Sequence, residues 1–333
     1  MTIFLTVAIP TYNRNQSLHK LVVSLLDLLT EDIELLIIDN ASDIPVEETL
    51  SDLIASHQNK RSVNIHRNAF NVGMSANIMK CFELSQGKYM WLLGDDDRIN
   101  LNSFSTINYN IKEHPEAVFF NFATSGSGSR GKTIVTNGDN FVSKIDQFGS
   151  LIFISACVFK RNTFVNHLRY GYIFAGTLAP HFALLLVSLK PDHVCILSNQ
   201  IIADNQHSDS TDNWSYMAGI CSFPLLIDCL SIFTNQKLLS QKMADSLLHP
   251  LNVAIEILHY SEKQIHRKEF LSYYFKYLGA KIYSLCNIKT RLQWLFLSLC
   301  PLFPSFFLNL LISYKKKSHG HFLLKNKENY YRV

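Results

Sequence analysis

The chain has 333 residues, of which 47% are apolar and 17% charged, and its formal net charge is +4. This composition is typical of a globular protein with enough apolar residues for one large core or two modest ones. It provides no wide basic surface, so it argues against a nucleic acid as partner.

The seven cysteines are odd in number and include no C-x-x-C pair. We interpret them as reduced core residues of a cytoplasmic protein rather than as metal ligands or a disulfide framework. The apolar run at 3–9 is too short for a signal peptide, so we expect the fold to begin at the first residues.

Strand and helix patterns alternate over roughly the first hundred residues. Short β-branched runs predict strands, and apolar residues at helical spacing predict helices between them. In chain order the predictions are strand 3–9, ended by Pro10, helix 17–29, strand 34–39, helix 46–56, strand 63–66, helix 74–85 and strand 89–93. This order predicts an α/β fold in which βαβ units form a mostly parallel central sheet with helices on both faces.

A polar segment follows each of the four predicted strands. In such sheets ligands bind beyond the carboxyl ends of the strands, so we expect these segments to meet at one rim. They lie at 11–14, 39–42, 67–73 and 94–97.

The fourth segment consists of Gly94 followed by Asp95, Asp96 and Asp97. Carboxylates this close repel one another, so a cation or a set of donors must neutralise them. Mg²⁺ and Mn²⁺ commonly use one or two protein carboxylates together with substrate phosphates. Acidic triplets also occur in solvated turns, so the other three segments decide the interpretation.

Together the four segments resemble those of the family 2 glycosyltransferases of the GT-A fold, over roughly residues 3–125. The matching sequences are Ile-Pro-Thr-Tyr-Asn-Arg at 9–14, Ile-Asp-Asn-Ala-Ser-Asp at 38–43, Arg-Asn-Ala-Phe-Asn-Val-Gly at 67–73 followed by Asn77, and Gly-Asp-Asp-Asp at 94–97. The resemblance implies a GT-A nucleotide-sugar-binding domain, a nucleotide-sugar donor and Mn²⁺ or Mg²⁺ as cofactor.

The resemblance also implies roles for individual residues. Asp39 would bind the base or ribose, and Thr11 and Tyr12 would line the nucleotide pocket. Asp95 and Asp97 would form the metal motif, with Asp97 as the direct ligand and Asp95 on the ribose or on metal-bound water. The other implied contacts with the nucleotide-sugar are Pro10, Arg14, Asn68, Asn71, Gly73, Asn77 and Asp96.

Several of these residues also have structural interpretations. Arg14 could cap the following helix, and Asp39 could mark the boundary between a strand and a turn. Gly73 is expected to supply an unusual backbone angle in either case. Phe70 and Met74 are expected in the core rather than in the site.

The general base on the acceptor hydroxyl is the point at which this chain departs from the family pattern. Family 2 members usually offer an Asp or Glu well downstream of the metal motif, but this chain has no carboxylate between Asp146 and Asp192. His181 occupies about the right place and can act as a base near neutral pH, with a capping or core histidine as the alternative. Asp192 and Asp204 are the next candidates.

Two later segments give weaker indications. Several GT-A enzymes close the metal site with a histidine from a late loop, and His207 is the candidate here, with a solvated loop residue as the alternative. The glycine- and serine-rich segment 125–132 lacks the spacing of a P-loop. We interpret it as a flexible excursion over the acceptor.

From about residue 215 the pattern changes to apolar helices at 225–233, 243–260 and 268–285. The uncharged segment 292–312 then precedes three consecutive lysines at 315–317. Prolines interrupt this segment, so we expect two short helices in a membrane interface rather than a span, with the lysines on anionic lipid. A buried helical hairpin is the alternative.

We therefore expect a GT-A domain over 1–214, with a nucleotide-sugar half at 1–125 and an acceptor half at 126–214. A helical, membrane-associating region at 215–333 would follow it. The expected function is sugar transfer from a nucleotide-sugar to a lipid-linked oligosaccharide in bacterial O-antigen, lipopolysaccharide or capsule synthesis, at the cytoplasmic face of the inner membrane.

Within the family, three features make the chain similar to enzymes that add a dideoxyhexose such as abequose. These features are its length, its 94–97 motif and the lack of any carboxylate between Asp146 and Asp192. A different class stays open because the usual base is missing. In that alternative the chain is a nucleotide-binding membrane scaffold that kept the fold but lost catalysis.

Overall fold

The chain divides into two compact units, Met1–Gln206 and His207–Val333. The computed structural model describes residues 3–124, 130–204, 222–230, 235–245 and 285–299. The first unit confirms the predicted α/β class.

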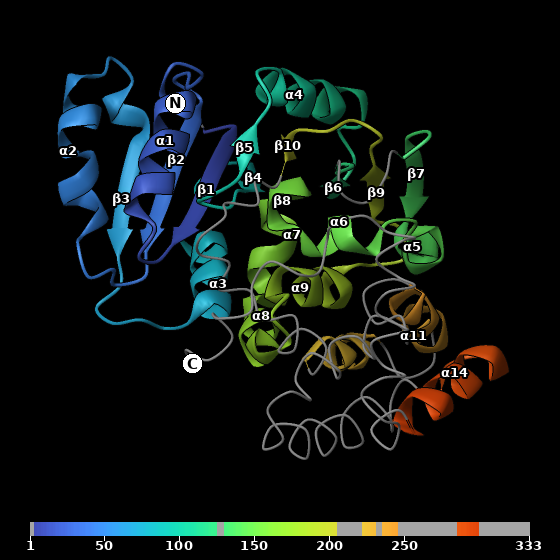
Figure 1. Ribbon diagram of the computed structural model, residues 1–333. Coiled ribbons are helices and arrows are strands. Elements are labelled where there is room, and N and C mark those ends of the chain that lie inside the picture. The colour runs from blue at the N-terminus through green and yellow to red at the C-terminus, as the bar shows by residue number, and fades with distance from the viewer. Residues whose placement is uncertain (1–2, 125–129, 205–221, 231–234, 246–284, 300–333) are drawn as a thin grey trace, which may run out of the picture. The chain divides into compact units, whose positions relative to one another are not determined.

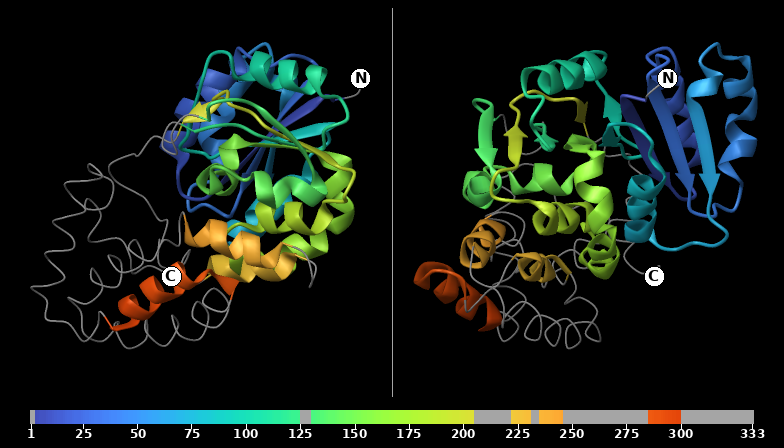
Figure 2. Two further views of the ribbon diagram at one scale, coloured as in Figure 1. Left: turned by 90° about the vertical axis from the view of Figure 1, so that its right-hand side faces the viewer. Right: turned by 180° about the vertical axis from the view of Figure 1, so that it is seen from behind.

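An eight-stranded sheet with the order β3-β2-β1-β4-β8-β6-β9-β7 forms the centre of the first unit (Figure 1). Strands β1 to β4 are mutually parallel, β8 runs antiparallel to both of its neighbours, and β7 is antiparallel to β9. Figure 2 shows β3 and β7 at opposite margins of the sheet. The strands are β1 Leu5–Thr11, β2 Ile33–Asp39, β3 Val63–Arg67, β4 Tyr89–Leu92, β6 Phe119–Asn121, β7 Ile134–Asn137, β8 Cys157–Lys160 and β9 Val194–Leu197.

Helices connect the strands, and a small two-stranded sheet joins β5 to β10. β5 comprises Arg98–Ile99 and β10 comprises Ala203–Asp204. The helices are α1 Asn15–Leu26, α2 Val46–Ser56, α3 Met74–Leu84, α4 Ser103–Glu113, α5 Gly138–Lys144, α6 Phe148–Ile152, α7 Arg161–Phe164, α8 Leu168–Ile173 and α9 Pro180–Ser188.

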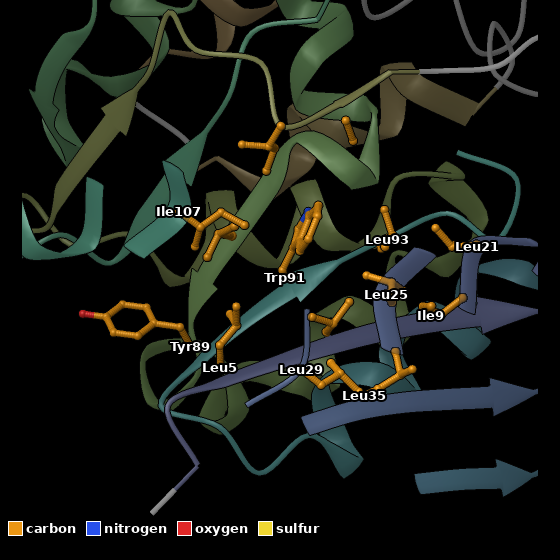
Figure 3. Packing of buried hydrophobic residues seen from close by; sticks show 14 of the residues in the cluster. Leu5, Ile9, Leu21, Leu25, Leu29, Leu35, Tyr89, Trp91, Leu93 and Ile107 are labelled. Carbon is orange, nitrogen blue, oxygen red and sulfur yellow. The ribbon is translucent and has the colours of Figure 1, made fainter. Parts of the chain in front are cut away.

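The core forms because successive side chains of a strand point to opposite faces and both faces of the central strands are apolar. Leu5 and Ile9 of β1 belong to one buried cluster with Trp91 of β4 (Figure 3). Leu21 and Leu25, one helical turn apart on α1, belong to the same cluster. The apolar spacing of the sequence therefore predicts both the sheet and the helix face that covers it.

Pro10 does not end the first strand, and the predicted boundary there is wrong. β1 continues to Thr11, but β4 pairs with it only as far as Ala8. Peptide groups alternate sides along a strand, so those of Ala8 and Pro10 point the same way, and the missing N–H of Pro10 lies beyond the end of β4. The proline therefore costs no hydrogen bond, and the strand carries Thr11 to the rim.

The segment 125–132 was expected to be flexible, and Arg130 contradicts this at its own position. Residues 125–129 lie outside the described part of the chain. The Arg130 side chain is almost fully buried. Nε lies 3.0 Å from both carboxylate oxygens of Asp146. Nη1 donates to the carbonyl oxygens of Asn121 at 3.0 Å and Ser198 at 2.7 Å. Arg130 therefore ties the ends of β6 and β9 to the segment before α6.

We expect Arg130→Met to lower the free energy of unfolding by about 3 kcal/mol, because it leaves a carboxylate and two carbonyl groups without their cationic partner. Urea unfolding followed by circular dichroism measures this. Lys132→Met, which removes an exposed charge two residues away, is the matched control. A loss below about 1 kcal/mol in Arg130→Met would contradict the structural role, since ordinary surface changes reach about 0.5 kcal/mol.

The cysteines that the structure describes are free thiols in buried positions, as the sequence interpretation expects. Burial raises the pKa of Cys157 and of Cys195 to about 12, so both thiols are protonated and unreactive near neutral pH. Cys221 and Cys300 lie outside the described residues.

The described residues of the second unit are helical, as predicted, but the boundaries differ. The expected helix 225–233 is a 3-10 helix, η6, at Phe223–Cys229. α11, at Gln236–Ala244, ends where the next predicted helix begins, and α14 covers Ile288–Leu299. The predicted helix 268–285 lies almost entirely outside the described part. No helix among the described residues is long and apolar enough to cross a membrane.

Candidate active site

The four polar segments meet at one rim of the sheet. Because β1, β2 and β3 are parallel neighbours, Thr11, Asp39 and Arg67 lie side by side at their carboxyl ends. Asp95 and Asp97 follow β4, which pairs with β1 in the same direction. Thr11 and Asp95, which are 84 positions apart in the chain, therefore share one site.

Asp95 is held from two sides. Thr11 Oγ1 donates to its Oδ2 at 2.7 Å, and Arg14 Nη1 donates to its Oδ1 at 3.1 Å. The same Arg14 nitrogen lies 2.5 Å from Asp96 Oδ2. Burial raises the pKa of Asp95 to about 6, although the charge of Arg14 opposes the rise. Both oxygens of Asp95 are thus occupied.

Asp97 differs from Asp95 because one of its oxygens is available. Ser155 Oγ donates to Asp97 Oδ2, whereas Oδ1 has no hydrogen-bond partner among the residues the structure describes. Only 8% of Asp97 is exposed, and burial raises its pKa to about 7, with the Ser155 hydrogen bond opposing the rise. Asp97 therefore presents a single carboxylate oxygen from a largely buried position.

The Asp97 carboxylate, with Asp95 beside it, fits a divalent cation of the Mg²⁺ or Mn²⁺ type that also binds water. In the described part of the chain no group of three or more His, Cys, Asp and Glu side chains is arranged to hold a metal. A hard cation that completes its shell with water and substrate phosphates needs only one or two carboxylates, so the donor set suits that class. His207, the predicted additional ligand, lies outside the described residues.

Asp39 is buried, and its oxygens are used locally. The backbone N–H of Ser42 donates to Oδ1 at 2.9 Å and that of Val46 to Oδ2 at 3.3 Å, while Arg67 forms an ion pair with Oδ2. Burial alone would raise the pKa of Asp39, but these hydrogen bonds outweigh it and the pKa lies below its ordinary value. Asp39 is therefore ionised and holds the loop before α2. Its contact with a nucleotide stays a prediction.

Four asparagines behind the rim bind mainly one another. Asn68 Nδ2 donates to Asn40 Oδ1 at 3.0 Å and to Asn77 Oδ1 at 2.8 Å. Asn40 Nδ2 donates to Asn71 Oδ1 at 2.7 Å. This network holds the loop after β3 against the end of β2. Gly73 ends that loop with a φ of +84°, the unusual backbone angle expected for it.

The apolar residues beside this loop are exposed, so the expectation that Phe70 and Met74 lie in the core is wrong. Phe70 is 69% and Met74 48% exposed, and Tyr12 at the same rim is 38% exposed. Met74 begins α3, and the buried face of that helix is formed by later residues such as Ile78 and Phe82.

Of the first two candidate bases, one is fully buried and the other lies at the far edge of the sheet. His181 is buried in α9 with Nε2 3.0 Å from the carbonyl oxygen of Leu151, and burial lowers its pKa to about 4. Asp192 is exposed in the turn before β9. Because β9 runs in the same direction as β4, this turn lies at the opposite edge of the sheet from Asp97.

Asp204 lies at the rim. β10 pairs with β5, and this pairing places Asp204 opposite Arg98, the residue after Asp97. Its Oδ1 is buried and has no hydrogen-bond partner in the described part of the chain. A buried oxygen without a partner costs free energy, which a ligand hydroxyl would recover.

Ser155 was missed in the sequence analysis because it lies in an apolar stretch without any motif. Only its position in the folded chain identifies it, because its hydroxyl contacts Asp97, which is 58 positions away in the sequence.

The sequence profile described as glycosyl transferase family 2 matches residues 6–175, just over half of the chain. The chain belongs to glycosyl transferase family 2. This membership confirms the resemblance drawn from the four rim segments, all of which lie inside the matched residues.

One curated relative and two solved structures show the extent of the likeness. The abequosyltransferase RfbV of Salmonella typhimurium is 32% identical over 105 residues, which are 31% of this chain and only 31% of that protein. Residues 1–349 of Staphylococcus aureus TarS in complex with UDP-GlcNAc match with a TM-score of 0.61 and 12% identity, over 98% of this chain and 95% of that one.

The mannosyltransferase PcManGT from Pyrobaculum calidifontis, in complex with GDP-Man and Mn²⁺, matches with a TM-score of 0.56 and 10% identity, over 96% of this chain and 88% of that one. At such identities the structural likeness shows the fold alone, and it confirms the predicted GT-A fold.

Proposed function

We propose that the chain transfers a sugar from a nucleotide-sugar to a lipid-linked oligosaccharide in bacterial O-antigen, lipopolysaccharide or capsule synthesis. The observation that carries this proposal is Oδ1 of Asp97, which has no hydrogen-bond partner in the described part of the chain and lies at the strand ends of a family 2 glycosyltransferase fold. The partial likeness to an abequosyltransferase supports a narrower donor, a nucleotide-linked dideoxyhexose such as abequose.

The charges of the reaction define what the rim residues do. Breaking the bond between sugar and phosphate develops positive charge at the anomeric carbon and negative charge on the departing diphosphate. A bound Mn²⁺ or Mg²⁺ supplies Lewis-acid neutralisation of that diphosphate. Asp97 would hold the cation, and Asp95, fixed by Thr11 and Arg14, would contact the ribose or a bound water.

We propose Asp204 as the residue that takes the proton of the acceptor hydroxyl. Its position beside the end of the Asp95–Asp97 motif and its unpartnered Oδ1 support this role. The buried, neutral ring of His181 and the distant position of Asp192 do not favour them as bases.

A catalytically inactive nucleotide-binding membrane scaffold of the same fold is the second candidate. The burial of His181, together with the lack of any carboxylate between Asp146 and Asp192, favours it. Under this reading the chain binds the donor without turnover.

A two-step experiment separates these candidates. Thermal unfolding with UDP, GDP, CDP and dTDP, each with and without Mn²⁺, should show one diphosphate that stabilises the full-length protein in a Mn²⁺-dependent way, because a ligand that binds the native state raises its stability. Incubation of the matching nucleotide-sugar with bacterial membrane lipids should then release nucleoside diphosphate. Stabilisation without release would support the scaffold, and no stabilisation would contradict both proposals.

We further propose that the protein acts as a peripheral protein at the cytoplasmic face of the inner membrane. On α14, Ile288, Leu292 and Leu295 follow one another at spacings of four and three, and they are 76%, 60% and 50% exposed. These spacings place them on one face of the helix. Such an exposed apolar face supports interfacial binding. The remainder of the predicted segment, and its lysines, lie outside the described residues.

Replacing Ile288 and Leu292 by serine is expected to reduce binding to phosphatidylglycerol vesicles by about a hundredfold or more, because each apolar side chain removed from the lipid forfeits about 1.5 kcal/mol and the two losses add. Flotation of the full-length protein measures the bound fraction. The matched control replaces Val23 and Val135, exposed residues of the first unit. Equal binding by both double variants would remove α14 from the membrane contact.

A further inference from the structure

Ser155 connects β4 to the metal motif from a buried position in η3, the 3-10 turn Ile154–Ala156. The backbone N–H of Gly94 donates to Ser155 Oγ at 2.8 Å, and Trp91 Nε1 donates to the Ser155 carbonyl oxygen at 2.9 Å. Ser155 Oγ in turn donates to Asp97 Oδ2. The serine is therefore fixed on both its main chain and its side chain.

The direction of these bonds leaves one arrangement for the hydroxyl proton. A serine hydroxyl has a single proton, and its oxygen already accepts from Gly94, so the proton points at Asp97. Gly94 also keeps the contact close, because a Cβ at that position would overlap Asp97 Oδ2. The carboxylate of Asp97 is thus confined both by Ser155 and by the Gly94 backbone.

We propose that Ser155 is a positioning residue for the divalent cation: by occupying Oδ2, it fixes the Asp97 carboxylate so that Oδ1 alone is presented to the metal. This inference rests on the proposed function, in which Asp97 is the direct ligand. Asp95 provides the contrast, because both of its oxygens are taken by Thr11 and Arg14.

The hydrogen bond from Ser155 fixes the orientation of the Asp97 carboxylate. The terminal torsion of an aspartate is broad, so an unrestrained carboxylate samples many orientations. A hydrogen bond to the oxygen that does not bind the metal removes this freedom before the cation arrives. Loss of such an outer-shell partner typically costs 10- to 100-fold in metal affinity.

The test measures Mn²⁺ binding to the full-length protein by electron paramagnetic resonance, with saturating nucleoside diphosphate of the kind that stabilises the wild type. Ser155→Ala is expected to weaken Mn²⁺ binding by roughly 10- to 100-fold. Affinity for the nucleoside diphosphate without Mn²⁺ should stay unchanged.

Ser150→Ala is the matched control. Ser150 is also fully buried, five residues upstream, but its hydroxyl donates to Asn121 Oδ1 at 2.7 Å rather than to Asp97. It loses a comparable buried hydrogen bond, so its Mn²⁺ affinity should equal that of the wild type. Equal losses in Ser150→Ala and Ser155→Ala would show a general structural effect and overturn the proposal.

Gly94→Ala provides a second approach if Ser155→Ala does not fold, because its new methyl group would overlap Asp97 Oδ2 and displace it. It is expected to weaken Mn²⁺ binding to a similar degree, and wild-type affinity in this variant would contradict the inference. The experiment distinguishes a failure of the proposed function from a failure of the positioning role of Ser155. A wild type that binds no Mn²⁺ contradicts the metal part of the proposed function, whereas wild-type binding with an unaffected Ser155→Ala contradicts the positioning role alone.

Discussion

Asp97→Asn is expected to lower kcat by roughly a thousandfold or more while leaving the fold intact. A bound metal contributes several kcal/mol to transition-state stabilisation, and the variant replaces its proposed direct ligand by a neutral amide. The amide keeps the shape of the side chain, and its oxygen can still accept from Ser155. Release of nucleoside diphosphate measures the rate, and thermal unfolding checks the fold.

Asp43→Asn is the control for this experiment, because Asp43 is an exposed carboxylate in a loop of the same rim and accepts from Asn13 Nδ2 at 3.1 Å. Its kcat should remain close to that of the wild type. Full wild-type activity in excess EDTA, or an active Asp97→Asn, would remove the metal from the mechanism.

Asp204→Asn is expected to lower kcat by about 10² to 10⁴, the usual contribution of a positioned general base, with nucleoside diphosphate affinity unchanged. The reason is that the amide cannot take the proton of the acceptor hydroxyl, although it fills the same space beside β5. Steady-state kinetics with saturating donor, together with calorimetric titration of the nucleoside diphosphate, separate catalysis from binding.

Asp192→Asn is the matched control for this variant. Asp192 lies at the opposite edge of the sheet, so its replacement should leave kcat unchanged. If Asp204→Asn retains wild-type kcat, Asp204 is not the base. If both variants retain activity while His181→Ala loses it without unfolding, the base is the buried histidine instead.

The fold of the first unit followed closely from local patterns. The predicted helix 46–56 has the same bounds as α2, and the strand 34–39 differs from β2 by one residue. The spacing of apolar residues predicts these elements because parallel strands and the helices that cover them bury continuous faces. Each such face gives a regular apolar pattern within a short segment of sequence. In the second unit, the predicted helix 225–233 was displaced and is a 3-10 turn, because apolar content identifies a buried segment but not its helix type.

The candidate site was predictable in its location and less so in its chemistry. Asp95 and Asp97 stand at a strand end whose direction the alternating pattern determines. The sequence could not show that the Asn68 and Asn77 amides bind each other, or that Asp39 holds its own loop. A polar side chain at a rim can face a ligand or a neighbour, and only the neighbour's position decides which.

The sequence by itself determined that this chain is a family 2 glycosyltransferase with an acidic motif at the carboxyl end of its fourth strand. It did so because the four rim segments resemble those of that family in their residues, order and spacing, and these are properties of the chain itself. Only the tertiary structure decided that Asp97, rather than Asp95, has an oxygen available for a cation. The deciding groups are Arg14 and Ser155, 81 and 58 positions from the carboxylates they hold, and only the assembled sheet brings them into contact.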